Sequence, residues 1–227
     1  MSETIFPLKH PHVWRASEGL NDAKHRVCTG FKSLDELLGG GLPAAGLIRL
    51  RALPGIGELT FLKHVLAENP YEKLTMLINA PGHLHAAWLV NNKIKPATVR
   101  LVNPENHEDT LWAAEQCLKS EACHCVILWL NSLNAKQARR LQVAASQHHT
   151  LCVLLESVKV RRESLPLALD LTLSPSLHGL QIEINKHVGG RGTGATEIYF
   201  RYTPDNAVIN LALRSNHGDN NPTQVVG

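Results

Sequence analysis

Short apolar runs alternate with amphipathic stretches through the middle of the chain. Each run has the length of a buried strand, and the stretches between runs repeat apolar positions every three or four residues. The expected strands are 47–52, 74–79, 99–102, 125–130 and 151–155, and the expected helices are 32–38, 59–66, 83–91, 108–120 and 134–147. Such alternation predicts a parallel sheet with crossover helices.

The helical periodicity stops after Pro166. Three further stretches, at 167–173, 180–187 and 197–202, have strand character and are joined by turns rich in Pro, Ser and Gly. We expect them to extend the sheet by antiparallel pairing at one end. The predicted fold class is therefore α/β, a mostly parallel central sheet flanked by helices, with antiparallel strands at the C-terminal end.

The two ends of the chain lack this regular pattern. Residues 1–25 have prolines and scattered charges without a sustained period, so we expect an extended arm. The last stretch, from Asn216 to Gly227, is rich in Asn, Asp, Gly and Pro, so we expect 204–227 to be an extension with a disordered end. Between them, 26–203 forms one domain, because 227 residues with 44% apolar content can bury one substantial core.

Composition narrows the class of protein. The net charge of +3 is only mildly basic, and the 5% of aromatic residues do not interleave with basic ones, so we expect weak or indirect contact with nucleic acid. The five cysteines are odd in number, and the chain begins without a secretory pattern. No apolar run approaches the ~18 residues of a membrane helix. These features predict a cytoplasmic protein with reduced thiols.

A glycine-containing turn lies where a phosphate-binding loop would lie, after the first long strand and before a helix. A working loop reads GxxxxGK[ST], because its amides and lysine hold phosphates and its hydroxyl positions magnesium. Here the sequence runs ALPGIGEL from Ala52 to Leu59, with glycines at Gly55 and Gly57 and an acid at Glu58. The acid replaces the lysine and would repel phosphates, while the leucine replaces the hydroxyl.

The second acidic position of such sites is also missing. It normally ends a buried strand with an aspartate that helps to hold magnesium, whereas this strand ends in Asn131. We therefore expect no ATPase activity, no cofactor and no metal. An ordinary strand-to-helix turn is an alternative interpretation that also predicts no ATPase. A third is a residual switch that holds ATP through backbone amides, with an affinity that disappears when Gly57 is replaced.

Two basic segments are candidates for contact with a partner or with DNA. Lys159, Arg161 and Arg162 follow one strand, and Lys186 and Arg191 lie in a glycine-rich segment between two others. Solvated loop cations and a flexible hairpin are the alternatives.

The run Cys123-His124-Cys125 contains zinc-ligand residue types, but it lacks a CxxC pair. We interpret Cys125 and Cys152 instead as small apolar residues that open buried strands.

Three segments carry a resemblance to a known family: TGFKSLDELLGGGLPAAGLIRL (29–50), LPGIGELTFL (53–62) and LWAAEQCLKSEACHCVILWL (111–130). They resemble the ImuA family, translesion-synthesis accessory proteins related to RecA and to the division inhibitor SulA. The resemblance covers roughly residues 12–202. Its front segment looks like the entry to RecA-type cores in general, whereas the PGIGE loop and the WAAEQ helix are more specific.

The resemblance implies a RecA-like core without an active site and a role in the SOS response. The implied partners are an ImuB-like protein, which looks like a polymerase but lacks activity, an error-prone replicative-type DNA polymerase, and RecA. A SulA-like inhibitor that sequesters the tubulin-like division protein FtsZ remains the alternative, since it would share the helix and buried strand at 110–130. SulA-like chains tend to be shorter and to lack the full front segment, which favours ImuA.

Overall fold

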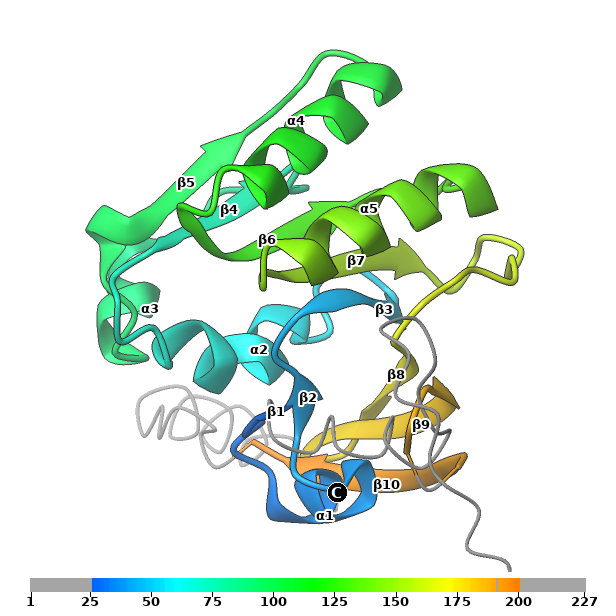
Figure 1. The fold of residues 1–227 in the computed structure, drawn as a ribbon. Helices are drawn as coiled ribbons and strands as arrows, with labels where there is room; N and C mark the ends of the chain where they lie inside the picture. Colours follow the sequence, from blue (N-terminus) through cyan, green and yellow to red (C-terminus); the bar gives the residue numbers. More distant parts are fainter. Residues whose placement is uncertain (1–25, 191, 201–227) are drawn as a thin grey trace, which may run out of the picture.

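A mixed eight-stranded sheet forms the centre of the protein (Figure 1). The computed structural model describes residues 26–190 and 192–200. The strand order is β10-β9-β8-β3-β7-β6-β4-β5. The strands are β3 (Gly46–Ala52), β4 (Leu74–Ile78), β5 (Val99–Val102), β6 (Cys123–Trp129), β7 (Leu151–Ser157), β8 (Leu169–Ser176), β9 (Gly179–His187) and β10 (Gly194–Tyr199).

Helices cover both faces of the parallel part of the sheet. Helices α4 (His107–Lys119) and α5 (Ala135–Gln147) lie on one face, and α2 (Glu58–Ala67) and α3 (Ala86–Asn91) lie on the other (Figure 1). Strand β3 is buried along its whole length because its alternate side chains enter two different clusters. Leu50 packs in the cluster of α2, and Leu47 packs in the cluster of α5.

Smaller elements complete the described part of the chain. Helix α1 (Lys32–Leu38) lies against β10, and the strands β1 (Arg26–Val27) and β2 (Leu42–Pro43) form a separate antiparallel pair. A 3₁₀ turn, η2 (Pro96–Thr98), precedes β5. In the described residues, no helix has both the length and the apolar character needed to cross a bilayer.

Local sequence signals fix several helix ends. Helix α1 ends at Gly39, whose φ of 70° is the left-handed conformation that glycine adopts most easily. Helix α4 begins where the Asn106 side chain accepts a hydrogen bond from the amide of Asp109. Helix α5 begins with a reciprocal capping box between Asn134 and Gln137.

The expected fold class is confirmed: the sheet is mostly parallel, helices flank it, and β9 and β10 are antiparallel at one end. The expected antiparallel pairing was wrong for the first of the three C-terminal strands where it meets the parallel part of the sheet. Strand β8 runs parallel to β3, because the connection from β7 passes over β3 and returns the chain to the same end of the sheet. The antiparallel pairing begins only with β9.

Some boundaries also differ from the expected ones. Helix α3 begins only at Ala86, because His85 before it has extended backbone; Leu84, one residue earlier, packs against the core. Strand β6 begins at Cys123, two residues before its expected start. The expected arm at 1–25, the end of the domain at 201–203 and the extension at 204–227 lie outside the described residues.

Candidate functional site

The turn between β3 and α2 forms a concave loop of backbone amides. Gly55 and Gly57 have φ values of 84° and 113°, a conformation that other residues adopt only with strain. Successive amides that point inward at the start of a helix form the usual protein cradle for phosphate.

The side chain of Glu58 fills this cradle. Its carboxylate accepts the amide of Gly55 on both oxygens, at 3.1 Å each, and the amide of Gly57 on Oε2 at 3.2 Å. Glu58 is 8% exposed although it is an acid at the first position of a helix. The loop therefore holds an anion, and that anion belongs to the chain itself.

An aromatic ring covers the outer side of the same loop. A Cβ atom added at Gly57 would lie 2.9 Å from the ring of Phe200, which also packs against Phe31 at a centroid distance of 6.2 Å. Leu59, at the position of the metal-positioning hydroxyl, packs against the core under α2. Gly57 thus lies beside an aromatic ring and Leu59 packs in the apolar core, and neither position offers a nucleotide a polar side chain.

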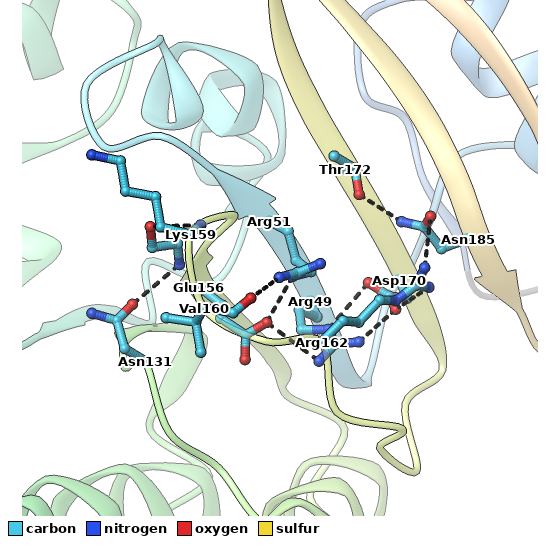
Figure 2. Close-up of polar contacts among 11 residues, drawn as sticks. Arg49, Arg51, Asn131, Glu156, Lys159, Val160, Arg162, Asp170, Thr172 and Asn185 are labelled. Atoms are coloured by element: carbon cyan, nitrogen blue, oxygen red, sulfur yellow. Dashed lines mark hydrogen bonds and ion pairs between the residues drawn. The ribbon is translucent and has the colours of Figure 1, made fainter.

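Asn131 lies two residues after the end of β6 and connects this end of the sheet to the end of β7. Its Oδ1 accepts the amide of Ser157 at 3.1 Å, at the end of β7 (Figure 2). Like Glu58, it lines a pocket of 280 Å³ at the carboxyl ends of β3, β4, β6 and β7. The structure therefore brings together the two positions that the sequence identified separately.

A third polar residue at this pocket was missed at the level of sequence. Asn79 follows β4 with a φ of 58°, and its Nδ2 donates to the carbonyl oxygen of Trp129 at 3.0 Å. The signal was available, because an asparagine directly after a buried strand is one of the few residues that tolerate this backbone conformation.

A buried ionic network lies beside the pocket (Figure 2). Arg49 is 1% exposed and donates to Asp170 from Nε at 3.1 Å and from Nη2 at 2.7 Å. It also contacts Glu156 Oε2 at 3.4 Å, and Arg51 Nε donates to the same oxygen at 2.8 Å. Burial raises the pKa of Glu156, and the two guanidinium groups oppose that rise.

Sequence reasoning did not find this network. Its signal was a pair of arginines at alternate positions of a strand with apolar neighbours, since a buried arginine needs a carboxylate partner. Nothing local identifies the partners, which come from β7 and β8 on either side of β3.

Three of the cationic candidates, Lys159, Arg161 and Arg162, lie in the segment that connects β7 to β8, and Lys186 contacts this segment from β9. Arg162 is engaged within the protein, since it donates to Asp170 at 2.8 Å and to Asn185 at 3.1 Å. Lys186 donates to the carbonyl oxygen of Leu165 at 3.0 Å.

Lys159 and Arg161 are exposed and have no side-chain partner among the described residues, whereas Arg191 lies outside them.

Four of the five cysteines, Cys117, Cys123, Cys125 and Cys152, lie in α4 or in strands of the sheet, whereas Cys28 is exposed before α1. Cys125 and Cys152 are fully buried on neighbouring strands, and burial raises the pKa of both thiols, that of Cys152 to about 12. Over residues 26–190 and 192–200, no three His, Cys, Asp or Glu side chains come together in a way that could hold a metal ion.

Many solved structures are similar in fold to this chain. No family model matches the sequence, and no curated protein matches it. The fold is similar to the crystal structure of SulA from Pseudomonas aeruginosa, with 22% sequence identity and a TM-score of 0.41. The likeness covers 48% of this chain and 97% of that one.

Proposed function

We propose that this chain is a non-catalytic, RecA-like accessory protein of SOS-induced, error-prone translesion DNA synthesis that acts through protein contacts in the cytoplasm. The observation that carries the proposal is the carboxylate of Glu58 in the amide cradle of its own loop. A nucleotide phosphate would have to displace this carboxylate and then lie beside it. This contact supports a role that does not depend on ATP, such as one that acts through contacts with other proteins.

The residues that would assist a bound nucleotide have also changed. Leu59 packs into the core, and Asn131 is a neutral amide whose oxygen is engaged by the backbone of β7. Neither offers a charged ligand to magnesium, which prefers carboxylate and phosphate oxygens. We expect no binding of ATP with magnesium in isothermal titration at millimolar concentration.

The assignment to an ImuA-like role rests on the three segments quoted above. The front segment folds as α1, β2 and β3, so the whole entry to the phosphate loop is retained. The expected partners are an ImuB-like protein, an error-prone polymerase and RecA, with DNA contacted weakly or indirectly. The exposed cations Lys159 and Arg161 are the residues we propose for such contacts.

The deciding experiment measures ultraviolet-induced mutation frequency and filamentation in cells that lack this gene. Loss of induced mutations with normal filamentation supports the proposal, because an accessory factor of lesion bypass acts on mutagenesis alone. Normal mutagenesis with lost filamentation overturns it and favours a SulA-like inhibitor of FtsZ.

Complementation refines the same experiment. The double variant Lys159→Glu/Arg161→Glu should restore fewer mutations than wild type. Lys32→Glu is the matched control, because Lys32 is 91% exposed on α1 and is remote in sequence from the β7–β8 connection. Equal complementation by both variants would exclude the two cations as a contact.

A further inference from the structure

Two cysteine side chains lie in contact where α4 ends and β6 begins. Cys117 is in the last turn of α4, and Cys123 is the first residue of β6. The Cys117 thiol donates a hydrogen bond to the sulfur of Cys123, and both side chains pack in the apolar cluster under α4 and α5. Because the two sulfur atoms already meet, rotation about side-chain bonds can bring them to bonding distance.

A short exposed turn lies against the Cys123 sulfur. It consists of Ser120, Glu121 and Ala122, and all three residues are exposed. The Ser120 hydroxyl lies 3.7 Å from Cys123 Sγ and donates to the carbonyl oxygen of Cys117 at 2.8 Å. Cys117 is half-buried, and Cys123 is 3% exposed. A small oxidant therefore has only this turn to pass before it reaches the pair of thiols.

The contact makes the two thiols differ in acidity. The hydrogen bond from Cys117 lowers the pKa of Cys123, and the Ser120 hydroxyl and the positive charge of Lys73 act in the same direction against the effect of burial. The same contact raises the pKa of Cys117. Cys123 therefore supplies a thiolate, which is the form that attacks oxidants, while Cys117 remains a thiol beside it.

The other three cysteines have no such arrangement, although all of them lie within the described residues. Cys125 and Cys152 are fully buried, and burial raises the pKa of both thiols. Cys28 is exposed, but its thiol donates to Asp35 Oδ2 at 2.9 Å, and this hydrogen bond raises its pKa. We therefore expect the exposed thiol of Cys28 to react more slowly than that of Cys123.

We propose that Cys117 and Cys123 form a reversible oxidation site, at which hydrogen peroxide converts the two thiols into an intramolecular disulfide. In the first step the Cys123 thiolate attacks a peroxide oxygen. An S–O bond forms, the O–O bond breaks, and the leaving hydroxide takes a proton from the solvent to become water. In the second step the Cys117 sulfur attacks the sulfenic acid at Cys123. The S–S bond forms, the S–O bond breaks, and the hydroxide leaves as water with the Cys117 proton, so two thiols supply the two electrons that reduce the peroxide.

The test treats the reduced full chain with hydrogen peroxide at pH 7, blocks the remaining thiols with N-ethylmaleimide and follows each cysteine by mass spectrometry. Wild type should lose two hydrogen atoms and give peptides joined through Cys117 and Cys123, which dithiothreitol separates. Each unit by which the pKa of a thiol falls toward neutrality raises its rate of attack about threefold, because the thiolate fraction rises about tenfold while nucleophilicity falls about threefold. Cys123 should therefore be oxidised at least about threefold faster than Cys28.

Cysteine-to-serine variants separate the two steps. Cys117→Ser keeps a hydroxyl donor beside Cys123 but removes the second thiol, so sulfenic acid should accumulate at Cys123 and react with dimedone. Cys123→Ser should leave Cys117 unoxidised at the same dose of peroxide. Cys28→Ser is the matched control, because it removes an exposed thiol and should leave the rate of disulfide formation unchanged.

The wild-type protein alone decides the outcome, even where a variant fails to fold. Oxidation of Cys28 ahead of Cys123 overturns the proposal. So does sulfinic acid at Cys123 in wild type without a link to Cys117. These measurements are independent of ultraviolet mutagenesis, so the oxidation site and the proposed function can fail separately.

Discussion

Replacement of Glu58 by alanine is the sharpest test of the self-filled loop. The change removes an acceptor of two backbone amides, those of Gly55 and Gly57, at 3.1–3.2 Å. A hydrogen bond to a charged group contributes about 1.5–3 kcal/mol, and water can partly replace the carboxylate because Gly55 is exposed. We expect Glu58→Ala to lower the free energy of unfolding by about 1.5–2.5 kcal/mol.

The matched control is Glu108→Ala. Glu108 is also an acid in the first turn of a helix, α4, but it is exposed and has no side-chain partner among the described residues. Its favourable interaction with the helix dipole is worth about 0.3–1 kcal/mol. The difference between the two variants in urea unfolding at pH 7 isolates the contribution of the amide cradle.

An added anion should rescue the Glu58 variant. If pyrophosphate enters the emptied cradle with a Kd of about 1 mM, about 10 mM of it restores about 1.4 kcal/mol. Wild type and Glu108→Ala should gain nothing comparable, because their cradle is already filled. The reasoning is refuted if Glu58→Ala costs no more than Glu108→Ala, or if pyrophosphate stabilises all three proteins equally.

Three further predictions concern stability in urea unfolding. Asp170→Asn should lower the free energy of unfolding by about 3–5 kcal/mol, because it leaves the buried charge of Arg49 without its closest carboxylate partner. Arg162→Ala should lower it by about 1 kcal/mol or less, because the Arg162 side chain is 43% exposed. Equal losses in the two variants would contradict this difference. Gly57→Ala should lower the free energy of unfolding by about 1–3 kcal/mol more than Gly39→Ala. Both glycines have positive φ, but only at Gly57 would the added Cβ lie 2.9 Å from the ring of Phe200. Similar losses would show that this ring moves to make room for the methyl group. Glu115→Gln should destabilise the protein at pH 7 and not near pH 3. The hydrogen bond from Lys119 lowers the pKa of the Glu115 carboxyl, so the stability that this carboxylate contributes disappears as the pH falls through that pKa. A loss of stability that does not depend on pH would contradict this role of Glu115.

The hydrophobic pattern predicted the elements well because the parallel strands are buried on both faces. Helix 32–38 and strand 99–102 were predicted to the residue, and the capping asparagines explain why α4 and α5 begin near their expected starts. The parallel contact between β3 and β8 was not predictable in this way. Strand order depends on which edge of β3 is free after β7 has paired, and that is a property of the whole sheet.

The site was predictable as a set of positions and not as a set of contacts. Glu58 and Asn131 were found because each stands at a defined place after a strand. The sequence predicted repulsion of phosphate by Glu58, but it could not show that the carboxylate turns back onto Gly55 and Gly57. That contact requires the helix to begin at Glu58 and both glycines to adopt positive φ.

The contact of Glu58 with its loop also bears on regulation. In proteins that bind nucleotides through such a loop, the ligand stabilises one arrangement of the neighbouring segments and its loss releases them. A ligand shifts a conformational equilibrium only by its differential affinity for the two states. Here the stabilising anion is covalently part of the chain, so it is present at all times. We therefore expect partner binding at the carboxyl edge of the sheet to have the same affinity with and without ATP, and an affinity that changes with ATP would contradict the proposed role of Glu58.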